Sequence, residues 1–524
     1  MKSEILKLRK QIYYYLKSRA HSYEDGTAEL EAYQTNQDTY ADREFKICTM
    51  DNLLNTAENS DIIYIGDFHT FDQNIRNVLR IIKLLVTKNK RPIIGLEMVD
   101  HSFQLVLDTY LEGHLTELEF LEEVNYHNSW RFPWTHYKLI FELARKHDIQ
   151  IVALNKQGTL NERDKFAAQL LKGILENEPD ASLVVLYGEL HISPNKIPAL
   201  TSDIAPNLKQ LIIHQNLDKV YWKLAEDQDK VEAVCFNPQE FCLLTAPPWV
   251  KYESMVYWYE NLCNDPEFDI HSYIIENGKK IFSDDTHENF ILICIQIINF
   301  LKLNIEEDEI ENFNLYDHTN LDYVEETLSS SLNENLVDYY EYLIATNRSF
   351  RFLENKFYCS SYSMNRISYL AGIHILHFYL EKKGLNALSV FSSNKKDSFF
   401  TLITLEAILA YFFSKIINPH RKCDMYLDYQ RASETKITKN ILNLFETKNF
   451  SSIEKLTLEE IYEVATPFGH ILGEYLYLRE AHEKSTSALQ ELLDNLSFHF
   501  EDFISIRDKI LKPFEYEKHQ KRYF

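Results

Sequence analysis

The fold of this chain is decided by the stretch Asp61-Ile62-Ile63-Tyr64-Ile65-Gly66-Asp67-Phe68-His69, an apolar run that ends in glycine, an acid and histidine. The same pattern returns in Leu183-Val184-Val185-Leu186-Tyr187-Gly188-Glu189-Leu190-His191. Short, nearly continuous apolar runs are typical of strands in a parallel sheet whose two faces are covered by helices. Because ligands bind outside the carboxyl ends of such strands, the two Gly-acid-apolar-His ends predict one polar site.

Further apolar runs lie between these two stretches and after them. They lie at 92–96, 149–154 and 211–213, and the residues between the first two strands have helical spacing, as in Ile75, Val78, Leu79, Ile82 and Leu85. Alternating strands and helices predict βαβ units with right-handed crossovers. A terminal strand is also expected around 241–245. We therefore predict an α/β fold, with an N-terminal parallel-sheet domain that has helices on both faces.

The rest of the chain has a different pattern. From Ser283 onward the sequence is almost purely helical, with Ser283-Asp284-Asp285 as a cap. A chain of 524 residues is longer than one hydrophobic core usually serves. We predict an N-terminal helical segment (1–50), an α/β domain (51–260) and a mainly α-helical C-terminal domain of unknown role (275–524), with the boundary near 250–280.

Composition and charge exclude several classes of function. The net charge of −24 opposes binding of a phosphate backbone, so no nucleic-acid partner is expected. The seven cysteines form no C-x-x-C pair, which argues against a disulfide framework and a zinc–thiolate site. No secretory signal is visible, and the apolar stretches 290–303 and 399–417 are interrupted by polar residues, as in core helices. We expect a cytoplasmic protein without a transmembrane segment.

Polar side chains stand at the end of every predicted strand. They are Asp67 and His69, Glu97, Asn155, Glu189 and His191, and His214 and Gln215. Only 12 glycines occur in the chain, yet Gly66, Gly95 and Gly188 stand one or two residues before an acid of this set. A residue without a β-carbon allows backbone or ligand to approach closely.

Imidazoles mixed with carboxylates suit a divalent metal of the zinc, manganese or iron type, and equally suit general acid–base chemistry. We predict that His69, Glu97 and His191 are metal ligands or catalytic residues. Asp67 and Glu189 are expected to orient them, and a cofactor would be contacted by Asp67, Glu189, Asn155 and Tyr187.

Structural readings of the same residues remain open. A single histidine at a strand end is more often an ordinary rim residue, but the twofold recurrence of the pattern favours a site at His69 and His191. Glu97 could equally be the partner of a helix cap, and Asn155 suits a turn or cap. For His214 a plain rim role is expected, and the histidines of the later helices, such as His377, are expected to be structural.

The order of these motifs resembles the ChaN-type haem-binding uptake family, which belongs with the Tiki metalloproteases and erythromycin esterases in one superfamily. The resemblance covers about residues 60–220 and rests on Ile65 to His69, Gly95 to Met98, Trp134 to Tyr137, Val152 to Asn155, Gly188 to His191, and Ile197-Pro198. It implies a ligand pocket at the strand ends and haem or iron handling. In the wider superfamily the positions of His69, Glu97 and His191 imply metal-dependent or acid–base hydrolysis.

Two departures from the family separate this chain from typical members. Asp67 stands where the family usually has glutamate, which shortens the reach of the carboxylate by one methylene. Typical members also carry an export or lipoprotein signal, whereas none is visible in this sequence. Three hypotheses follow: a protein that binds haem or a divalent metal ligand (Mn, Zn or Fe), a metal-dependent hydrolase, and an interaction protein with a degenerate site. In the binding hypothesis the helical domain supplies a partner surface or a lid. A protein partner or self-association is expected to involve this domain.

Overall fold

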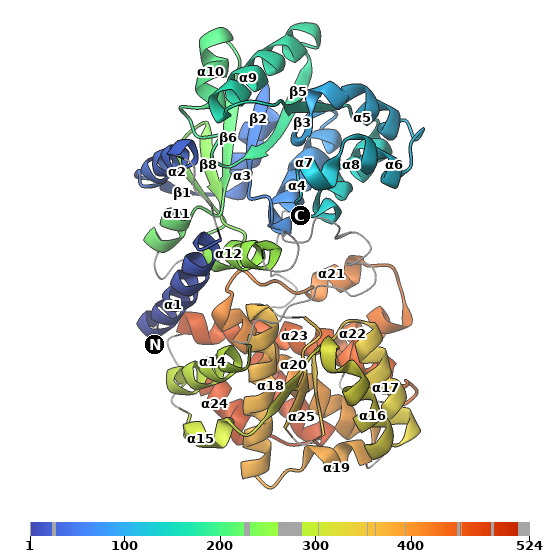
Figure 1. The fold of residues 1–524 in the computed structure, drawn as a ribbon. Coiled ribbons are helices and arrows are strands. Elements are labelled where there is room, and N and C mark those ends of the chain that lie inside the picture. The colour runs from blue at the N-terminus through green and yellow to red at the C-terminus, as the bar shows by residue number, and fades with distance from the viewer. Residues whose placement is uncertain are drawn as a thin grey trace. The chain divides into compact units, whose positions relative to one another are not determined.

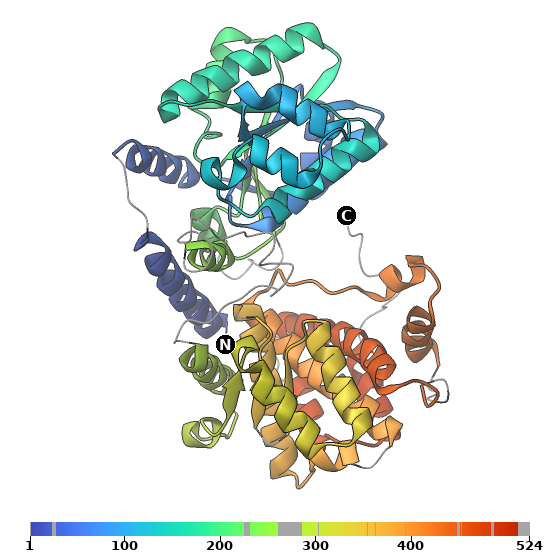
Figure 2. The ribbon, with the colours of Figure 1, turned by 45° about the vertical axis from the view of Figure 1, so that its right-hand side comes forward.

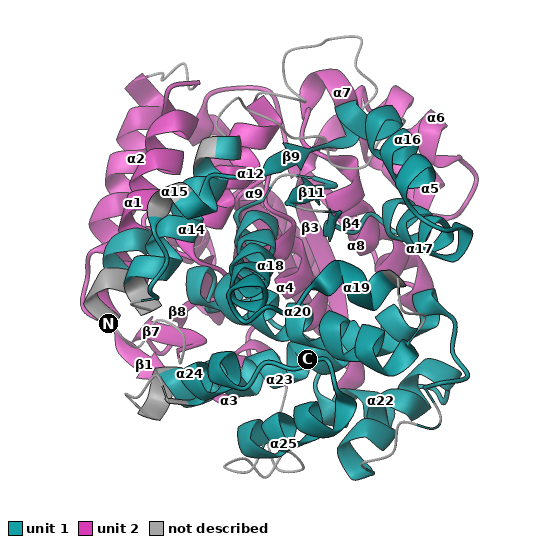
Figure 3. Ribbon diagram, turned by 90° about the horizontal axis from the view of Figure 1, so that it is seen from below, with its two compact units in different colours: residues 1–9, 277–522 teal, residues 10–276, 523–524 magenta. Residues whose placement is uncertain are grey.

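We analysed a computed structural model of the chain, which describes residues 2–511 except 24–27, 225–230, 260–285, 302, 354, 362, 393–394, 448–450, 452 and 484–486. The predicted cap at Ser283 therefore lies outside the described residues. The chain forms two compact units, which are coloured separately in Figure 3. Residues 10–276 form the sheet unit, and residues 1–9 with 277–522 form the helical unit.

The sheet unit contains an eight-stranded sheet in the order β1-β7-β8-β6-β2-β5-β3-β4 (Figure 1). Its strands are β1 (Lys46–Cys48), β2 (Ile62–Asp67), β3 (Arg91–Asp100), β4 (Ile151–Asn155), β5 (Ala181–Gly188), β6 (Gln210–Gln215), β7 (Ala233–Asn237) and β8 (Glu240–Leu243). The six strands from β8 to β4 are parallel, whereas β7 and β1 are antiparallel additions at one edge. The predicted α/β class is confirmed, and the sheet is mixed at that edge.

Helices cover both faces of this sheet because successive side chains of a strand point to opposite sides. Ile63 and Ile65 of β2 belong to one core, with α3 (Met50–Glu58), α4 (Asp72–Thr87) and α8 (Trp134–His147). Ile62 and Tyr64 belong to the other, with α9 (Leu160–Asn177) and α10 (Ile197–Ile204). The helices of the first face are blue to cyan in Figure 2. The continuous apolar runs of the sequence thus fill two cores at once.

One strand is longer than the sequence predicts. The apolar run was expected to stop at Leu96, but β3 continues to Asp100 because Met98 and Val99 are also buried. Its register with β4 shifts between Leu96 and Asp100. Glu97 therefore lies within a strand, at the point where the pairing is irregular, and not in the loop that follows.

The helical unit is built around α20 (Lys396–Ile417), which is buried along nearly its whole length. It packs against α18 (Met364–Lys382) and α23 (Leu458–Glu483) at glycines: a Cβ added to Gly372 would lie 2.7 Å from the Cα of Ala410. Among the described residues α20 is the one helix long and apolar enough to cross a membrane, and its burial is that of a core helix.

A small sheet in the helical unit was not predicted. It consists of β9 (Asn314–Tyr316), β10 (Phe350–Phe352) and β11 (Lys356–Tyr358), in the order β10-β11-β9. Each strand is only three residues long, so none offers the run of alternating residues by which a strand is recognised in a sequence. These three short strands are the exceptions to the mainly α-helical pattern that was expected from Ser283 onward.

Candidate functional site

The ends of β2 and β5 lie side by side, which brings the two motifs together. In the parallel pairing of these strands Asp67 stands opposite Gly188, and the backbone N–H of Glu189 donates to the carbonyl of Asp67 at 3.0 Å. The next strand, β3, carries Glu97 to the other side of β5. Residues that are far apart in the sequence thus meet at one edge of the sheet.

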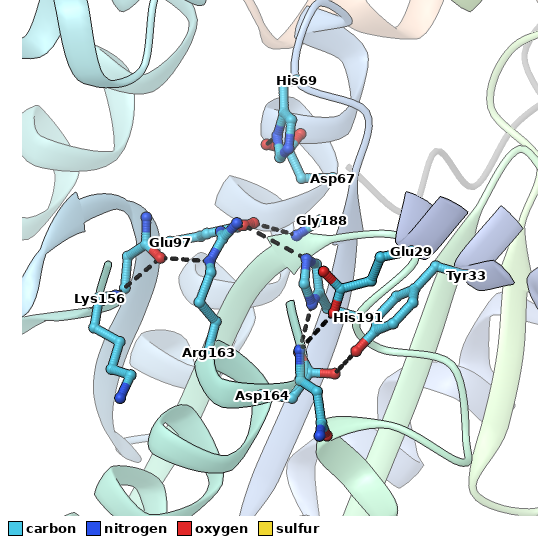
Figure 4. A network of polar contacts seen from close by, with 12 residues as sticks. Glu29, Tyr33, Asp67, His69, Glu97, Lys156, Arg163, Asp164, Gly188 and His191 are labelled. Atoms are coloured by element: carbon cyan, nitrogen blue, oxygen red, sulfur yellow. Dashed lines mark hydrogen bonds and ion pairs between the residues drawn. The ribbon is translucent and has the colours of Figure 1, made fainter. Parts of the chain in front are cut away.

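Gly188 is the point on which three of the predicted site residues converge (Figure 4). A Cβ placed on this glycine would lie 3.2 Å from Oε2 of Glu97, and 3.4 Å from both Cδ2 of His191 and Cε1 of His69. The distance to Glu97 is tighter than usual, whereas the two distances of 3.4 Å are ordinary van der Waals contacts. A larger residue at this position would therefore press first on the carboxylate of Glu97, and glycine leaves that space to the site.

Glu97 is held as an ionised carboxylate. Its Oε2 accepts a hydrogen bond from the backbone N–H of Gly188 at 2.6 Å, and its Oε1 forms an ion pair with Arg163 and lies 4.0 Å from Nε2 of His191. Burial alone would raise the pKa of Glu97, but His191, His69, Arg163 and the Gly188 N–H together lower it. Asn155 positions the arginine, because its Oδ1 accepts from Nε of Arg163 at 2.8 Å.

His191 is oriented by Asp164, which was not expected from the sequence. Its Nδ1 is hydrogen-bonded to Oδ1 of Asp164, and the other carboxylate oxygen accepts from the hydroxyl of Tyr33 at 2.9 Å. The rings of Tyr33 and Tyr187 lie with their centroids 5.5 Å and 5.1 Å from that of His191. Tyr33 comes from α2 (Ala28–Ala41), so the segment predicted as a separate N-terminal part contributes to this site.

The only sequence signal for Arg163 and Asp164 is indirect. Thr159 and Glu162 form a capping box that fixes the start of α9 just beyond the end of β4. The charged residues of the next turn are thereby held at the carboxyl edge of the sheet, where Arg163 faces Glu97 and Asp164 faces His191. No local pattern marks Tyr33, because its partner Asp164 is 131 residues away.

His69 forms a second histidine–aspartate pair on the opposite side of Gly188. Its Nδ1 lies 2.8 Å from Oδ2 of Asp67, which also accepts from the hydroxyl of Tyr137 at 2.6 Å. Burial opposes the charged imidazole, but Asp67 and then Glu97 attract it, and the pKa of His69 is raised. Oδ1 of Asp67 is buried and has no hydrogen-bond partner among the described residues.

Aromatic side chains surround the accessible edge of His69. Its ring centroid lies 4.6 Å from that of Trp130 and 4.7 Å from that of Phe132. The side chain is 24% exposed, and within the described part of the chain Nε2 makes no hydrogen bond. An imidazole fixed through one nitrogen, with the other open, can bind a ligand or accept a proton.

Glu189 does not join this cluster. Its side chain lies over Gly66, where an added Cβ would fall 1.6 Å from Oε2, and it contacts Nδ1 of His214 at 2.5 Å. Nε2 of His214 is 3.2 Å from Glu240, which is paired with Arg43. Burial would lower the pKa of His214, but Glu189 and Glu240 raise it to about 9. His214, expected to be a plain rim residue, is thus buried between two carboxylates.

This raised pKa predicts a loss of stability at alkaline pH. A histidine whose folded pKa exceeds its unfolded value contributes fully below about pH 6.5, and that contribution is lost as pH rises through about 9. We expect the thermal midpoint of the sheet unit to fall between pH 7 and pH 10. The measurement is tryptophan fluorescence on heating, and His214→Phe is the control, since it should show a shallower dependence over the same range.

The contacts also bear on the predicted metal role. Both oxygens of Glu97 and Nδ1 of His191 are bonded to protein groups. Over the described ranges, no group of three or more His, Cys, Asp or Glu side chains is arranged to hold a metal ion. Ligation of Mn, Zn or Fe by His69, Glu97 and His191 therefore stays a prediction, which this arrangement does not favour.

Comparison with known proteins agrees with the resemblance seen in the motifs. Residues 53–163 match the sequence model of the family described as "Haem-binding uptake, Tiki superfamily, ChaN", which confirms the resemblance over that part of the chain. A solved structure titled "Cofacial heme binding to ChaN of Campylobacter jejuni" is 14% identical, with a TM-score of 0.28, and covers 32% of this chain and 87% of that chain. No curated protein matches the chain.

Proposed function

We propose that the sheet unit binds haem and that His69 is its iron ligand, since residues 53–163 are similar to a haem-binding uptake family. The observation that carries this proposal is the Asp67–His69 pair at the end of β2. Nδ1 of His69 is fixed by a buried carboxylate, whereas Nε2 lies at a partly exposed aromatic edge. The carboxylate–histidine arrangement is the one that orients metal-binding imidazoles in proteins.

The chemistry of the surrounding residues fits this ligand. Axial ligation of haem requires a histidine or tyrosine next to apolar surface, and Trp130 and Phe132 supply aromatic surface beside His69. Tyr137 donates to Asp67 and so holds the carboxylate that orients the imidazole. Bound haem would supply an iron centre whose redox and ligand-binding properties depend on its axial ligand.

Absorption spectroscopy tests the proposal directly. Hemin is titrated into the purified full-length protein, and a Soret band that shifts and saturates at one equivalent of hemin is the expected result. Elemental analysis of the protein as purified measures iron, manganese and zinc in the same sample. A titration in which the spectrum never departs from that of free hemin would rule out the proposed function.

A second candidate function is acid–base hydrolysis, and a specific observation favours it. Two histidines, each oriented by an aspartate, flank the ionised Glu97 around Gly188. A histidine held by a carboxylate can take a proton from an attacking water and return it to a leaving group. His191 and His69 would perform these transfers, and Arg163 pairs with the carboxylate of Glu97 between them.

Hydrolysis of an activated ester such as p-nitrophenyl acetate tests this candidate. His191→Gln is expected to lower the rate constant about 100-fold, because general acid–base catalysis typically contributes that much. His114→Gln is the matched control, since His114 is exposed in the same unit. Equal rates for the two variants would exclude His191 from catalysis. Haem binding by His69 does not require His191. The result for His191→Gln therefore tests hydrolysis without testing haem binding.

We propose further that the protein acts in the cytoplasm and that the helical unit provides a surface for a protein partner or self-association. The six cysteines of the described residues are free thiols, which supports a reducing compartment. Size-exclusion chromatography with light scattering of the full-length chain tests the self-association.

A further inference from the structure

The helical unit contains a cavity of about 370 Å³ that is lined by residues of α18, of α19 (Ala387–Ser392), of the loop between these helices and of the β10–β11 hairpin. Its polar lining residues are Arg351, Asn355, His377, Glu381 and Asn386, and Leu388 supplies apolar surface. Figure 1 labels α18 and α19. A volume in this range is typical of small-molecule sites, which have mainly preformed walls and a few polar groups. The cavity is independent of the site on the sheet unit.

Arg351 is the central feature of this cavity. It is the middle residue of β10, and its side chain is only 5% exposed. Nη2 lies 3.5 Å from Oδ1 of Asn355 and 3.6 Å from the carboxylate of Glu381, which is itself 57% exposed. A guanidinium presents N–H donors in a planar fork that matches a carboxylate, so its place on the wall of a cavity favours an anionic group there.

A histidine–glutamate pair stands next to the arginine. Nε2 of His377, which lines the cavity, is 2.6 Å from Oε1 of Glu406. Burial and then Arg351 lower the pKa of His377 well below its usual value, whereas burial raises the pKa of Glu406 to about 7. Both shifts favour the neutral forms of the two side chains, so the pair opposes a nearby anion only weakly.

Charge at the exposed side of the cavity narrows the class of ligand. Glu381 repels a second negative group and accepts hydrogen bonds, so it favours a hydroxyl or an ammonium. We propose that the cavity binds a small hydroxy- or amino-carboxylate. Its carboxylate pairs with Arg351, and its second polar group faces Glu381 and the His377–Glu406 pair.

Calorimetric titration of the full-length protein tests this proposal, with L-lactate, L-serine and inorganic phosphate as probes. We expect saturable binding of lactate or serine, and a loss of affinity of about tenfold or more in Arg351→Gln, because a charge-assisted hydrogen bond is removed. Arg348→Gln is the matched control: Arg348 is 44% exposed, pairs with Glu463 and does not line the cavity. The Arg348→Gln variant should bind each probe with the same affinity as the unchanged protein.

A second variant separates loss of the site from loss of the fold. Leu388→Trp fills the cavity without touching the charge of Arg351, and it should weaken binding to the same extent. If Arg351→Gln fails to fold, the binding affinity of Leu388→Trp alone tests whether the ligand occupies the cavity. The proposal is overturned if neither carboxylate binds saturably, if phosphate alone binds, or if the folded variants retain the affinity of the unchanged protein.

Discussion

His69→Ala is expected to abolish the saturable Soret band of the hemin-titrated protein and to weaken hemin binding about 100-fold or more. The substitution removes the imidazole whose Nε2 lies at the partly exposed aromatic edge, and loss of groups that merely support a metal ligand already costs about 10–100-fold. The free energy of unfolding should change far less than the free energy of hemin binding, because the ring of His69 is partly exposed and Asp67 keeps its hydrogen bond from Tyr137.

Two further histidine variants make this test specific for His69. His114→Ala removes an imidazole that is 71% exposed, and it measures adventitious binding of hemin to surface histidines. His191→Ala removes the buried imidazole, whose Nδ1 is bonded to Asp164. Both should keep the band. A band that survives in His69→Ala but disappears in His191→Ala would move the ligand assignment to the other side of Gly188.

His214→Phe is expected to lower the free energy of unfolding of the sheet unit by about 3–5 kcal/mol, because it breaks a buried charge network by removing one partner. The phenyl ring keeps most of the volume, but Glu189 and Glu240 lose the imidazole between them. Glu240 retains Arg43, and Glu189 retains the backbone N–H of Gln215. These remaining contacts place the expected value at the lower end of the range.

Denaturant unfolding followed by tryptophan fluorescence measures this change in the sheet unit specifically. All five tryptophans of the chain, at positions 130, 134, 222, 249 and 258, lie within residues 10–276. His114→Phe is the matched control and should shift stability by no more than about 0.5 kcal/mol, as is usual for exposed positions. A His214→Phe midpoint equal to that of the control would show that the network contributes nothing measurable.

The contrast between Glu97 and Glu189 shows how far local patterns reach. Both acids follow an apolar run and a nearby glycine, so the sequence gives them equivalent positions at the edge of the sheet. In the folded chain Glu97 meets His191 and Arg163 at Gly188, whereas Glu189 lies over Gly66 and contacts His214. Their surroundings differ because β5 lies between β2 and β3, and β6 lies on the far side of β2.

The sequence by itself determined the six parallel strands β2 to β6 and β8, the two-sided cover of the sheet, and the edge of the sheet at which His69, Glu97 and His191 lie. These features follow from residue periodicity and from the position of polar residues after apolar runs, which are local properties. Only the tertiary structure decided that Asp164 and Tyr33 position His191 and that Arg163 pairs with Glu97. Those contacts join segments 27 to 131 residues apart, and their formation depends on the order in which strands pair and helices pack.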